Sequence, residues 1–199
     1  MTDSEIISHI LNGNRDSYRL LVERYQSMVF RTCMGFLHNK EDAEDLTQEV
    51  FIQAYQSLLS FRGASTISTW IYRIAINASL NKVRKSSKSF LLQRLDVLFG
   101  SDKSKVHSLI ASDTENPENI LIESEHREWV QKALNSLPEN QRTAIVLSKY
   151  DDLSQKEIAE IMNTSEGAVE ALIQRAKTNL REKLSSSVKK NKKNTVGKI

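Results

Sequence analysis

The sequence predicts an all-α protein built from two small helical domains that a flexible linker joins. Only six glycines and two prolines occur among 199 residues, so long helices are expected and hairpin turns are not. Apolar residues recur at spacings of three and four, the period of an amphipathic helix, and no segment alternates convincingly as a strand would. The expected divisions are a first domain at residues 1–87, a linker at 88–117, a second domain at 118–185 and a basic disordered tail at 186–199.

Four helices are expected in the first domain. Their positions are residues 3–12, Asp16 to the break at His38 and Asn39, residues 40–59, and Ser68 onward. Asp16 is placed to cap the second helix, and acidic residues at the start of the third suit the positive end of a helix dipole. The core side of the third helix comprises Ala43, Leu46, Val50, Phe51, Ala54, Tyr55 and Leu58. A polar, glycine-containing loop over residues 61–69 precedes the fourth helix.

The fourth helix presents two faces with different chemistry. One is a broad apolar arc of Ile71, Tyr72, Ala75, Ile76, Ala78, Leu80 and Val83. The other combines an aromatic ring with amides and cations: Trp70, Arg73, Asn77, Asn81, Arg84, Lys85 and Lys88. A half-buried tryptophan beside solvated basic side chains would explain this second face. A surface that stacks a base and neutralises phosphates would explain it equally well, so the helix alone leaves both interpretations open.

The second domain has the spacing of a helix-turn-helix unit. Its expected elements are a helix over residues 120–137, a helix from Pro138 to Tyr150, a short helix after Ser154, a turn at 163–165 and a last helix over 166–184. Ser154 and Glu157 fit the capping box S-x-x-E at the start of the short helix. Ala159 is small where two helices must cross closely.

The last helix would enter the major groove of DNA by its N-terminal end. The residues that this places near bases and phosphates are Ser165, Glu166, Ala168, Glu170, Ala171, Gln174, Arg175 and Lys177. A plain three-helix bundle without a DNA role is the alternative that the pattern itself leaves open.

Between the domains, polar clusters and Pro117 indicate a linker, and the apolar residues 90–99 predict a short helix that packs on one of the domains. Charge alternates along the chain although the net charge is only +3: residues 1–60 carry −4, 61–110 carry +7, 111–155 carry −5 and 156–199 carry +5. Two basic blocks that alternate with two acidic ones predict two separate contacts with a polyanion.

Several classes of protein do not fit the sequence. It has no apolar run that resembles a signal peptide or a membrane span, so a cytoplasmic protein without membrane insertion is expected. The single cysteine, Cys33, excludes an internal disulfide and sits among apolar residues that predict burial. No glycine-rich phosphate loop, metal-spaced histidine and cysteine set or nucleophile motif occurs, so we expect no enzyme activity, catalytic residue, cofactor or metal site.

Three motifs in this order resemble the extracytoplasmic-function (ECF) sigma factors of bacterial RNA polymerase: DAEDLTQEVFIQAY, TWIYRIAIN and EIAEIMNTSEGAVEALIQRA. The resemblance covers nearly the whole chain outside the linker and the tail. It implies an alternative sigma factor that binds core RNA polymerase and directs promoter-specific transcription initiation, with the first domain melting the −10 element and the second binding the −35 element. A stand-alone helix-turn-helix regulator is the alternative, although it would not need the stacking surface of the first domain.

The resemblance also assigns residues to these contacts. The −10 set consists of Phe61, Arg62, Ser65, Thr66, Ser68, Trp70, Arg73, Asn77, Asn81, Arg84 and Lys85, with Phe61 as the wall of a pocket for a flipped base. The expected polymerase contacts are the β′ clamp coiled coil and the β flap. For the β′ contact the residues are Asp45, Gln48 and Glu49, with Phe51 or Ile52 beside them. An anti-sigma factor is a further expected partner, and the linker would thread toward the RNA exit path.

One stretch departs from the family pattern. The recognition helix reads SEGAVEAL where the family usually carries S-x-G-T-V-K-S-R, so Glu170 replaces a lysine and Leu172 an arginine. Glu170 would either accept a hydrogen bond from a cytosine amino group or weaken the upstream contact. In the second case another DNA-bound partner would choose the promoter.

Overall fold

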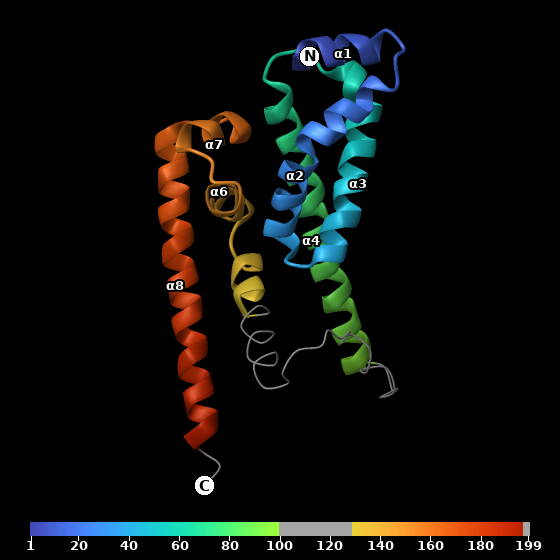
Figure 1. Cartoon of the computed structure of the whole chain (residues 1–199). Coiled ribbons are helices and arrows are strands. Elements are labelled where there is room, and N and C mark those ends of the chain that lie inside the picture. The colour runs from blue at the N-terminus through green and yellow to red at the C-terminus, as the bar shows by residue number, and fades with distance from the viewer. Residues whose placement is uncertain (100–128, 197–199) are drawn as a thin grey trace, which may run out of the picture.

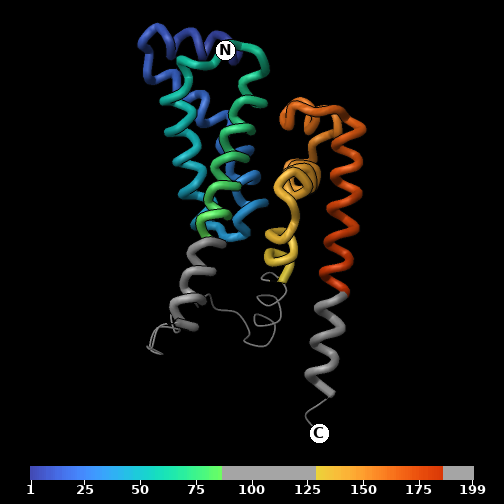
Figure 2. Tube along the Cα trace, turned by 180° about the vertical axis from the view of Figure 1, so that it is seen from behind, coloured from blue at the N-terminus to red at the C-terminus, as the bar shows by residue number. Residues whose placement is uncertain are grey.

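The computed structural model describes the backbone of residues 1–99 and 129–196 and the side chains of residues 1–86 and 129–185. The regular elements in these ranges are all helices, which confirms the predicted all-α class. Figures 1 and 2 show two helical units side by side, the first formed by α1 to α4 and the second by α6 to α8.

Helix α2 is the centre of the first domain and packs against the other three helices. The elements are α1 (Asp3–Leu11), α2 (Ser17–Leu37), α3 (Lys40–Ser57), the 3-10 turn η1 (Leu58–Ser60) and α4 (Ile67–Phe99). Leu21 and Val29 of α2 are fully buried in the core, together with Val50 of α3 and Ile71 of α4. The apolar positions that recur along each helix therefore meet in one core, as their period predicts.

Asparagines cap two of these helices. The Asn39 Oδ1 accepts a hydrogen bond of 2.9 Å from the N–H of Asp42 at the start of α3. The predicted cap by Asp16 is wrong, because this residue already has helical dihedrals and its carboxylate makes no capping bond. Asn14 takes that role, since its Oδ1 accepts the N–H of Ser17 at 3.3 Å.

The second domain contains the predicted helix-turn-helix. A helical stretch at residues 129–135 leads to α6 (Glu139–Tyr150), α7 (Gln155–Met162) and α8 (Glu166–Val196). Both bonds of the predicted Ser154–Glu157 capping box are present at the start of α7. Asn163 ends α7 in the left-handed region with φ of 51°, and the fully buried Val169 fixes α8 against α7.

Two helices are longer than expected. Residues 90–99 are the continuation of α4 and do not form a separate helix. Helix α8 continues to Val196, beyond the expected end near Leu184, so the residues predicted to be a disordered tail are helical as far as that position. Neither extension contains glycine or proline, so no residue in them interrupts a helix. The rest of the linker and residues 120–128, the first half of the predicted helix at 120–137, lie outside the described residues, and the second half is helical over 129–135.

The two domains pack directly on each other: α6 lies against α2, and α7 lies against α4 (Figures 1 and 2). One apolar cluster contains residues of both domains, among them Phe36 and Leu80 of the first and Leu147 and Ile158 of the second. Within the described ranges, no helix has the length and apolar character needed to cross a membrane.

Candidate nucleic-acid and polymerase interfaces

Two aromatic rings lie together where η1 leads into α4. The ring centroids of Phe61 and Trp70 are 5.3 Å apart and their planes are inclined by 52°. Both side chains are half-buried against the first-domain core, which leaves part of each ring in contact with solvent. The tryptophan is thus neither an ordinary core residue nor free on the surface, and the pair can offer an aromatic face to a base.

The polar loop before α4 is held by its own hydroxyl groups. Thr66 Oγ1 accepts the N–H of Thr69 at 3.2 Å and lies 2.9 Å from the Oγ of Ser68. These bonds give Thr66 the role of N-cap of α4. Ser65 donates a weak bond of 3.3 Å to the Thr66 carbonyl, and Arg62 is exposed. The loop that carries the predicted base contacts is therefore preorganised by the helix it starts.

The structure divides the predicted polar stripe of α4 into two groups. Asn77, Asn81 and Lys85 are exposed, as the sequence predicts. Arg73 instead reaches the second domain, where its Nε donates to the carbonyl of Ile161 at 2.9 Å and its Nη2 to the carbonyl of Glu160 at 2.8 Å.

Arg84 is also engaged by the second domain. It makes a two-pronged ion pair with Glu139 of α6, with N–O distances of 2.6 and 3.1 Å. Two of the cations predicted to meet DNA are thus bound within the chain in this structure.

The apolar arc of α4 is divided as well. Ile71, Ala75 and Val83 belong to the first-domain core. Tyr72, Ile76 and Leu80 belong to the cluster that includes the second domain. The arc is broad because α4 has neighbours from both domains, which the sequence pattern does not distinguish.

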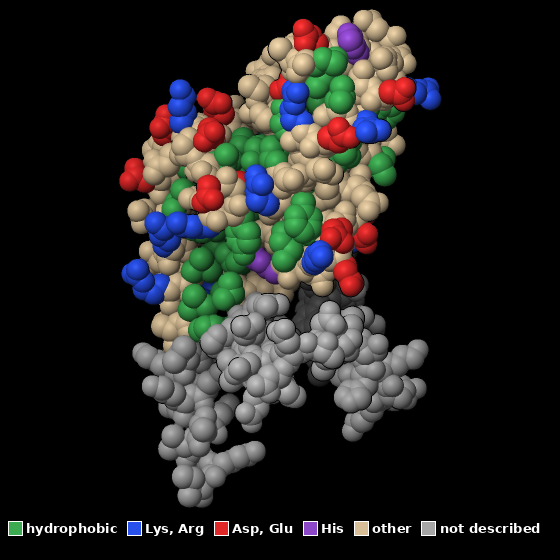
Figure 3. Space-filling model, viewed as in Figure 1, with side chains coloured by type: hydrophobic (Ala, Val, Ile, Leu, Met, Phe, Trp, Pro, Cys, Tyr) green, Lys and Arg blue, Asp and Glu red, His purple; other side chains and the backbone are tan. Residues whose placement is uncertain are grey.

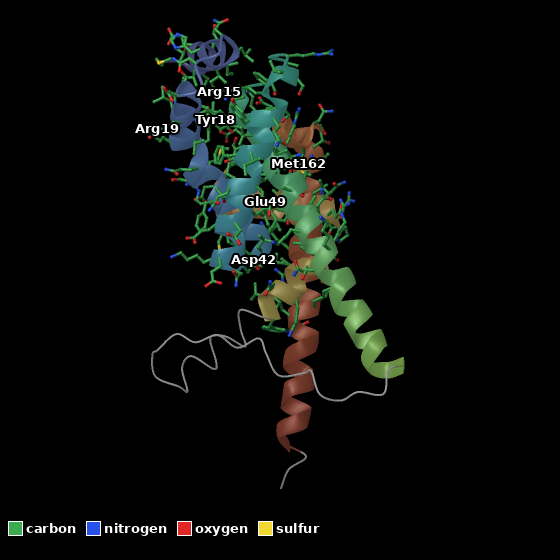
Figure 4. The ribbon with its side chains drawn as sticks, turned by 90° about the vertical axis from the view of Figure 1, so that its right-hand side faces the viewer. Arg15, Tyr18, Arg19, Asp42, Glu49 and Met162 are labelled. Carbon is green, nitrogen blue, oxygen red and sulfur yellow. The ribbon has the colours of Figure 1, made fainter. Side chains whose placement is uncertain are left out.

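The acidic helix α3 presents the residues predicted to meet polymerase. Asp45, Gln48 and Glu49 are exposed, and Figure 4 shows Glu49 and Asp42 along the outer side of α3. Of the two apolar candidates, Phe51 is 6% exposed and lies in the core, whereas Ile52 is 58% exposed. Phe51 therefore cannot contact a partner at this surface, and Ile52 can.

Sequence reasoning missed two apolar residues beside this surface. Tyr55, which the pattern placed on the core side, is 40% exposed. Its ring packs edge-to-face on that of Tyr18, with the ring centroids 4.8 Å apart. Leu59 is 85% exposed. Tyr55 and Leu59 follow Ile52 at spacings of three and four residues, which predicts that the three side chains lie on the same side of the helix.

The N-terminal part of α8 is open to solvent on the side away from α7. The exposed members of the predicted set are Ser165, Glu166, Glu170, Gln174, Arg175 and Lys177, and Ala168 and Ala171 are half-buried. Ser165 has a structural role, because its Oγ accepts the N–H of Ala168 at 3.2 Å and caps α8.

Charge changes sign along this domain. On the face drawn in Figure 3, acidic side chains gather around α7 and the start of α8, and basic ones lie further along α8. The sequence has the same order, with Glu166 and Glu170 preceding Arg175 and Lys177. The end of the helix that would enter the groove first is therefore acidic.

Among the described residues, no group of three or more His, Cys, Asp or Glu side chains is arranged to hold a metal ion. Cys33 is fully buried, and burial raises the pKa of its thiol. Its neighbour Ser79 donates a long contact of 3.8 Å to the sulfur.

The fold is that of a two-domain all-α protein whose second domain contains a helix-turn-helix. Residues 21–89 match the family described as sigma-70 region 2, and residues 127–180 match sigma-70, region 4. The chain is 34% identical over 178 residues to the ECF RNA polymerase sigma factor SigW of Bacillus subtilis, covering 89% of this chain and 94% of that protein. It is 33% identical over 190 residues to the ECF RNA polymerase sigma-E factor of Escherichia coli K12, with coverage of 96% and 98%.

The chain belongs to the ECF family of RNA polymerase sigma factors, and its function is to direct transcription initiation. This is not an enzyme family.

Solved structures share the fold. CnrH in complex with the cytosolic domain of CnrY has a TM-score of 0.60 and 21% identity, with coverage of 92% of this chain and 97% of that one. The sigma factor RpoE in complex with the anti-sigma factor NepR from Bartonella quintana has a TM-score of 0.53 and 23% identity, with coverage of 84% and 96%.

Proposed function

We propose that this sigma factor opens promoter DNA with the surface formed by the loop at residues 61–69 and the exposed side of α4. The observation that carries the proposal is the Phe61–Trp70 pair, with Trp70 on the same stripe of α4 as the exposed amides of Asn77 and Asn81. Strand separation needs an aromatic face on which an unpaired base can stack, and cations that neutralise the phosphates beside it. Arg62 and Lys85 are the exposed cations of this set.

The outer side of α3 is the proposed docking surface for core polymerase. Asp45 and Glu49 supply negative charge, and Ile52, Tyr55 and Leu59 supply an apolar continuation. Such a surface complements a basic helical partner with apolar side chains, which the family resemblance identifies as the β′ clamp coiled coil. The second domain would contact the β flap.

Run-off transcription with bacterial core RNA polymerase on a genomic promoter library tests the function. Transcripts that depend on the added protein and share a downstream element are expected. Association with duplex DNA without association with core enzyme would contradict the proposal and favour a stand-alone regulator.

A second proposal concerns promoter choice. Because Glu166 and Glu170 lie at the end of α8 that would enter the groove, we expect weak binding to an upstream element. A partner bound to DNA would then select the promoter. A footprint of the chain on a −35 element that depends on its sequence would remove the need for this partner.

The chain itself would catalyse no reaction and would act in the cytoplasm, where its polymerase is found. An anti-sigma factor remains a proposed partner, as for the solved relative that was captured with NepR.

A further inference from the structure

The hydroxyl group of Thr66 uses all of its hydrogen-bonding capacity within the chain. A threonine hydroxyl has one proton to donate and two lone pairs that accept. Thr66 donates its proton to Oγ1 of Thr69 at 2.9 Å and accepts the N–H of the same residue at 3.2 Å. The Oγ of Ser68 lies 2.9 Å from Thr66 Oγ1, and because the proton of Thr66 is already used, Ser68 is the donor of this bond. An unpaired base could therefore reach this oxygen only by breaking one of the three bonds.

These bonds tie an exposed loop to the buried start of α4. Thr66 itself is exposed, whereas Thr69 is buried and Ile67, between them, belongs to the first-domain core. The carbonyl of Thr66 also accepts the N–H of Trp70 at 3.1 Å. Thr66 is thus bonded through its side chain to the first turn of α4 and through its backbone to the residue that carries the indole ring.

Phe61 and Trp70 are held at opposite ends of the loop. The N–H of Phe61 donates to the carbonyl of Leu58 at 3.0 Å, which fixes Phe61 to η1. Between the two rings Gly63 turns the chain with φ of 70°, and a Cβ atom there would meet nothing within 4 Å. Because the turn makes no close contact at this point, the distance of 5.3 Å between the ring centroids depends on the core and on the bonds at each end of the loop.

Ser68 lies on the far side of α4 from the tryptophan, whereas other polar groups lie nearer to it. Ser68 precedes Trp70 by two positions, which is about 200° around a helix, so the two side chains point to opposite sides. Asn77 follows Trp70 by seven positions, which is about two turns, and lies on the same side. The side chains of Asn77 and Arg62 have no hydrogen-bond or ion-pair partner among the described residues, so their donors are free for bases and phosphates.

We propose that Thr66 is a positioning residue, which fixes the Phe61–Trp70 pair for an unpaired base and does not contact that base itself. The inference rests on the proposed role of the loop and α4 in promoter opening, and it changes the part that the family resemblance gives to Thr66. Polar contacts to the open strand come instead from side chains with free donors, such as Arg62 and Asn77. Thr66 then determines how well the open strand is held, and not which base is preferred.

Run-off transcription from a promoter library with a randomised downstream element tests the inference. A barcode in the transcribed part of each template identifies its element. With limiting full-length chain and core polymerase, Thr66→Val should lower the transcript yield by roughly two- to thirtyfold, the effect of losing a helix N-cap. The base preference at every position of the element should stay that of the wild type. Thr66→Ser keeps the hydroxyl and should restore the yield.

Thr2→Val is the matched control. It removes a threonine cap from α1, in the same domain, and leaves the loop before α4 unchanged. At a temperature where circular dichroism shows both variants to be folded, Thr2→Val should give the transcript yield of the wild type. Equal losses in Thr2→Val and Thr66→Val would attribute the effect to the stability of the domain and overturn the inference.

The fluorescence of Trp70 measures the positioning directly and without DNA. The chain has two tryptophans, so Trp129→Phe leaves Trp70 as the only one. In that background Thr66→Val should increase the quenching of Trp70 by acrylamide, and Thr66→Ser should not. Quenching that does not change in Thr66→Val would contradict the inference.

The outcomes separate this inference from the proposed function. A changed preference for one base in Thr66→Val would show that Thr66 contacts the base, and an unchanged yield would show that its bonds do not matter for opening. Either result overturns the positioning role and leaves the proposed function intact. Wild-type protein that initiates at no promoter with core polymerase would overturn the proposed function itself, whereas the quenching of Trp70 would still show whether Thr66 holds the ring.

Discussion

Thr32 in α2 and Asp151 at the end of α6 are hydrogen-bonded across the two domains, 119 positions apart in the sequence. The other carboxylate oxygen of Asp151 lies 3.6 Å from Nε of Arg31 and accepts no hydrogen bond from the described residues. Burial raises the pKa of this carboxyl, although Thr32 and Arg31 act in the opposite direction. The contact between the domains therefore contains a carboxylate that is only partly compensated.

Domain docking should weaken as pH rises above the ordinary carboxyl pKa of 3.8 and the buried Asp151 loses its proton. Because its pKa is higher in the docked state, docking takes up a proton, and the stability that this supplies is lost as pH rises through the docked-state pKa. Burial lowers the pKa of His38 and would give the opposite dependence below pH 6.5, so the measurement belongs in a His38→Gln background. Energy transfer between two dyes, one attached to each domain, should fall as pH rises in the His38→Gln variant. In the double variant His38→Gln/Asp151→Asn the energy transfer should not change with pH. An equal fall in that variant would contradict the assignment of the pH dependence to Asp151.

Trp70→Ala should impair promoter opening more than initial binding. Loss of a stacking ring costs about 1–3 kcal/mol per base, and the base becomes available only after strands separate. The measurement is fluorescence of 2-aminopurine placed in the downstream element, with run-off transcription in parallel. Arg19→Ala is a suitable control, since Arg19 is exposed on α2 and pairs with Glu23. Equal losses in the two variants would argue against a stacking role.

Glu49→Lys should weaken association with core polymerase and leave binding to single-stranded DNA unchanged. The substitution reverses one charge of the α3 surface, which complements a basic partner in the proposed complex. Association with core enzyme at two salt concentrations is the measurement, and the defect should be larger at low salt. Glu23→Lys makes the same charge change on α2. If both reversals act alike, the effect arises from net charge and not from docking.

Glu170→Lys should strengthen binding to duplex DNA. Replacing an acid by a base at the entering end of α8 should add about one phosphate contact, which steepens the dependence of log K on log salt by about 0.9. Titration of the full chain with upstream duplex DNA at several salt concentrations measures the slope. The control is Glu182→Lys, an exposed position further along the same helix. An unchanged slope in Glu170→Lys would place this residue away from DNA.

Local signals predicted much of the fold because they act between neighbours in the sequence. The capping box of Ser154 and Glu157 connects residues three positions apart, and the structure contains both of its bonds. Asp16 failed as a cap because Asn14, two positions earlier, offers an equivalent oxygen with better geometry. Periodicity likewise identified the buried faces, but it could not say which neighbour covers them.

The hydrogen bonds of Arg73 to the second domain could not be predicted from local signals. Its acceptors are backbone carbonyls 87 and 88 positions away. Because every residue has a backbone carbonyl, the sequence does not indicate which one will accept a hydrogen bond. For the same reason the arc of α4 was recognised as apolar, while its division between two cores was not. Gly35 in the last turn of α2 carried no interpretation until its neighbours in α6, Val146 and Tyr150, were known.

The space at Gly35 gives a criterion for sorting relatives by sequence. A Cβ atom at residue 35 would lie 2.7 Å from Cγ1 of Val146 and 2.9 Å from Cγ of Tyr150, both in α6. A sigma factor with alanine or a larger residue at the equivalent position can therefore bring its α6 equally close to α2 only if smaller side chains replace Val146 and Tyr150. The three positions should then change together among relatives that pack their two domains in this way, although none of them belongs to either proposed DNA surface.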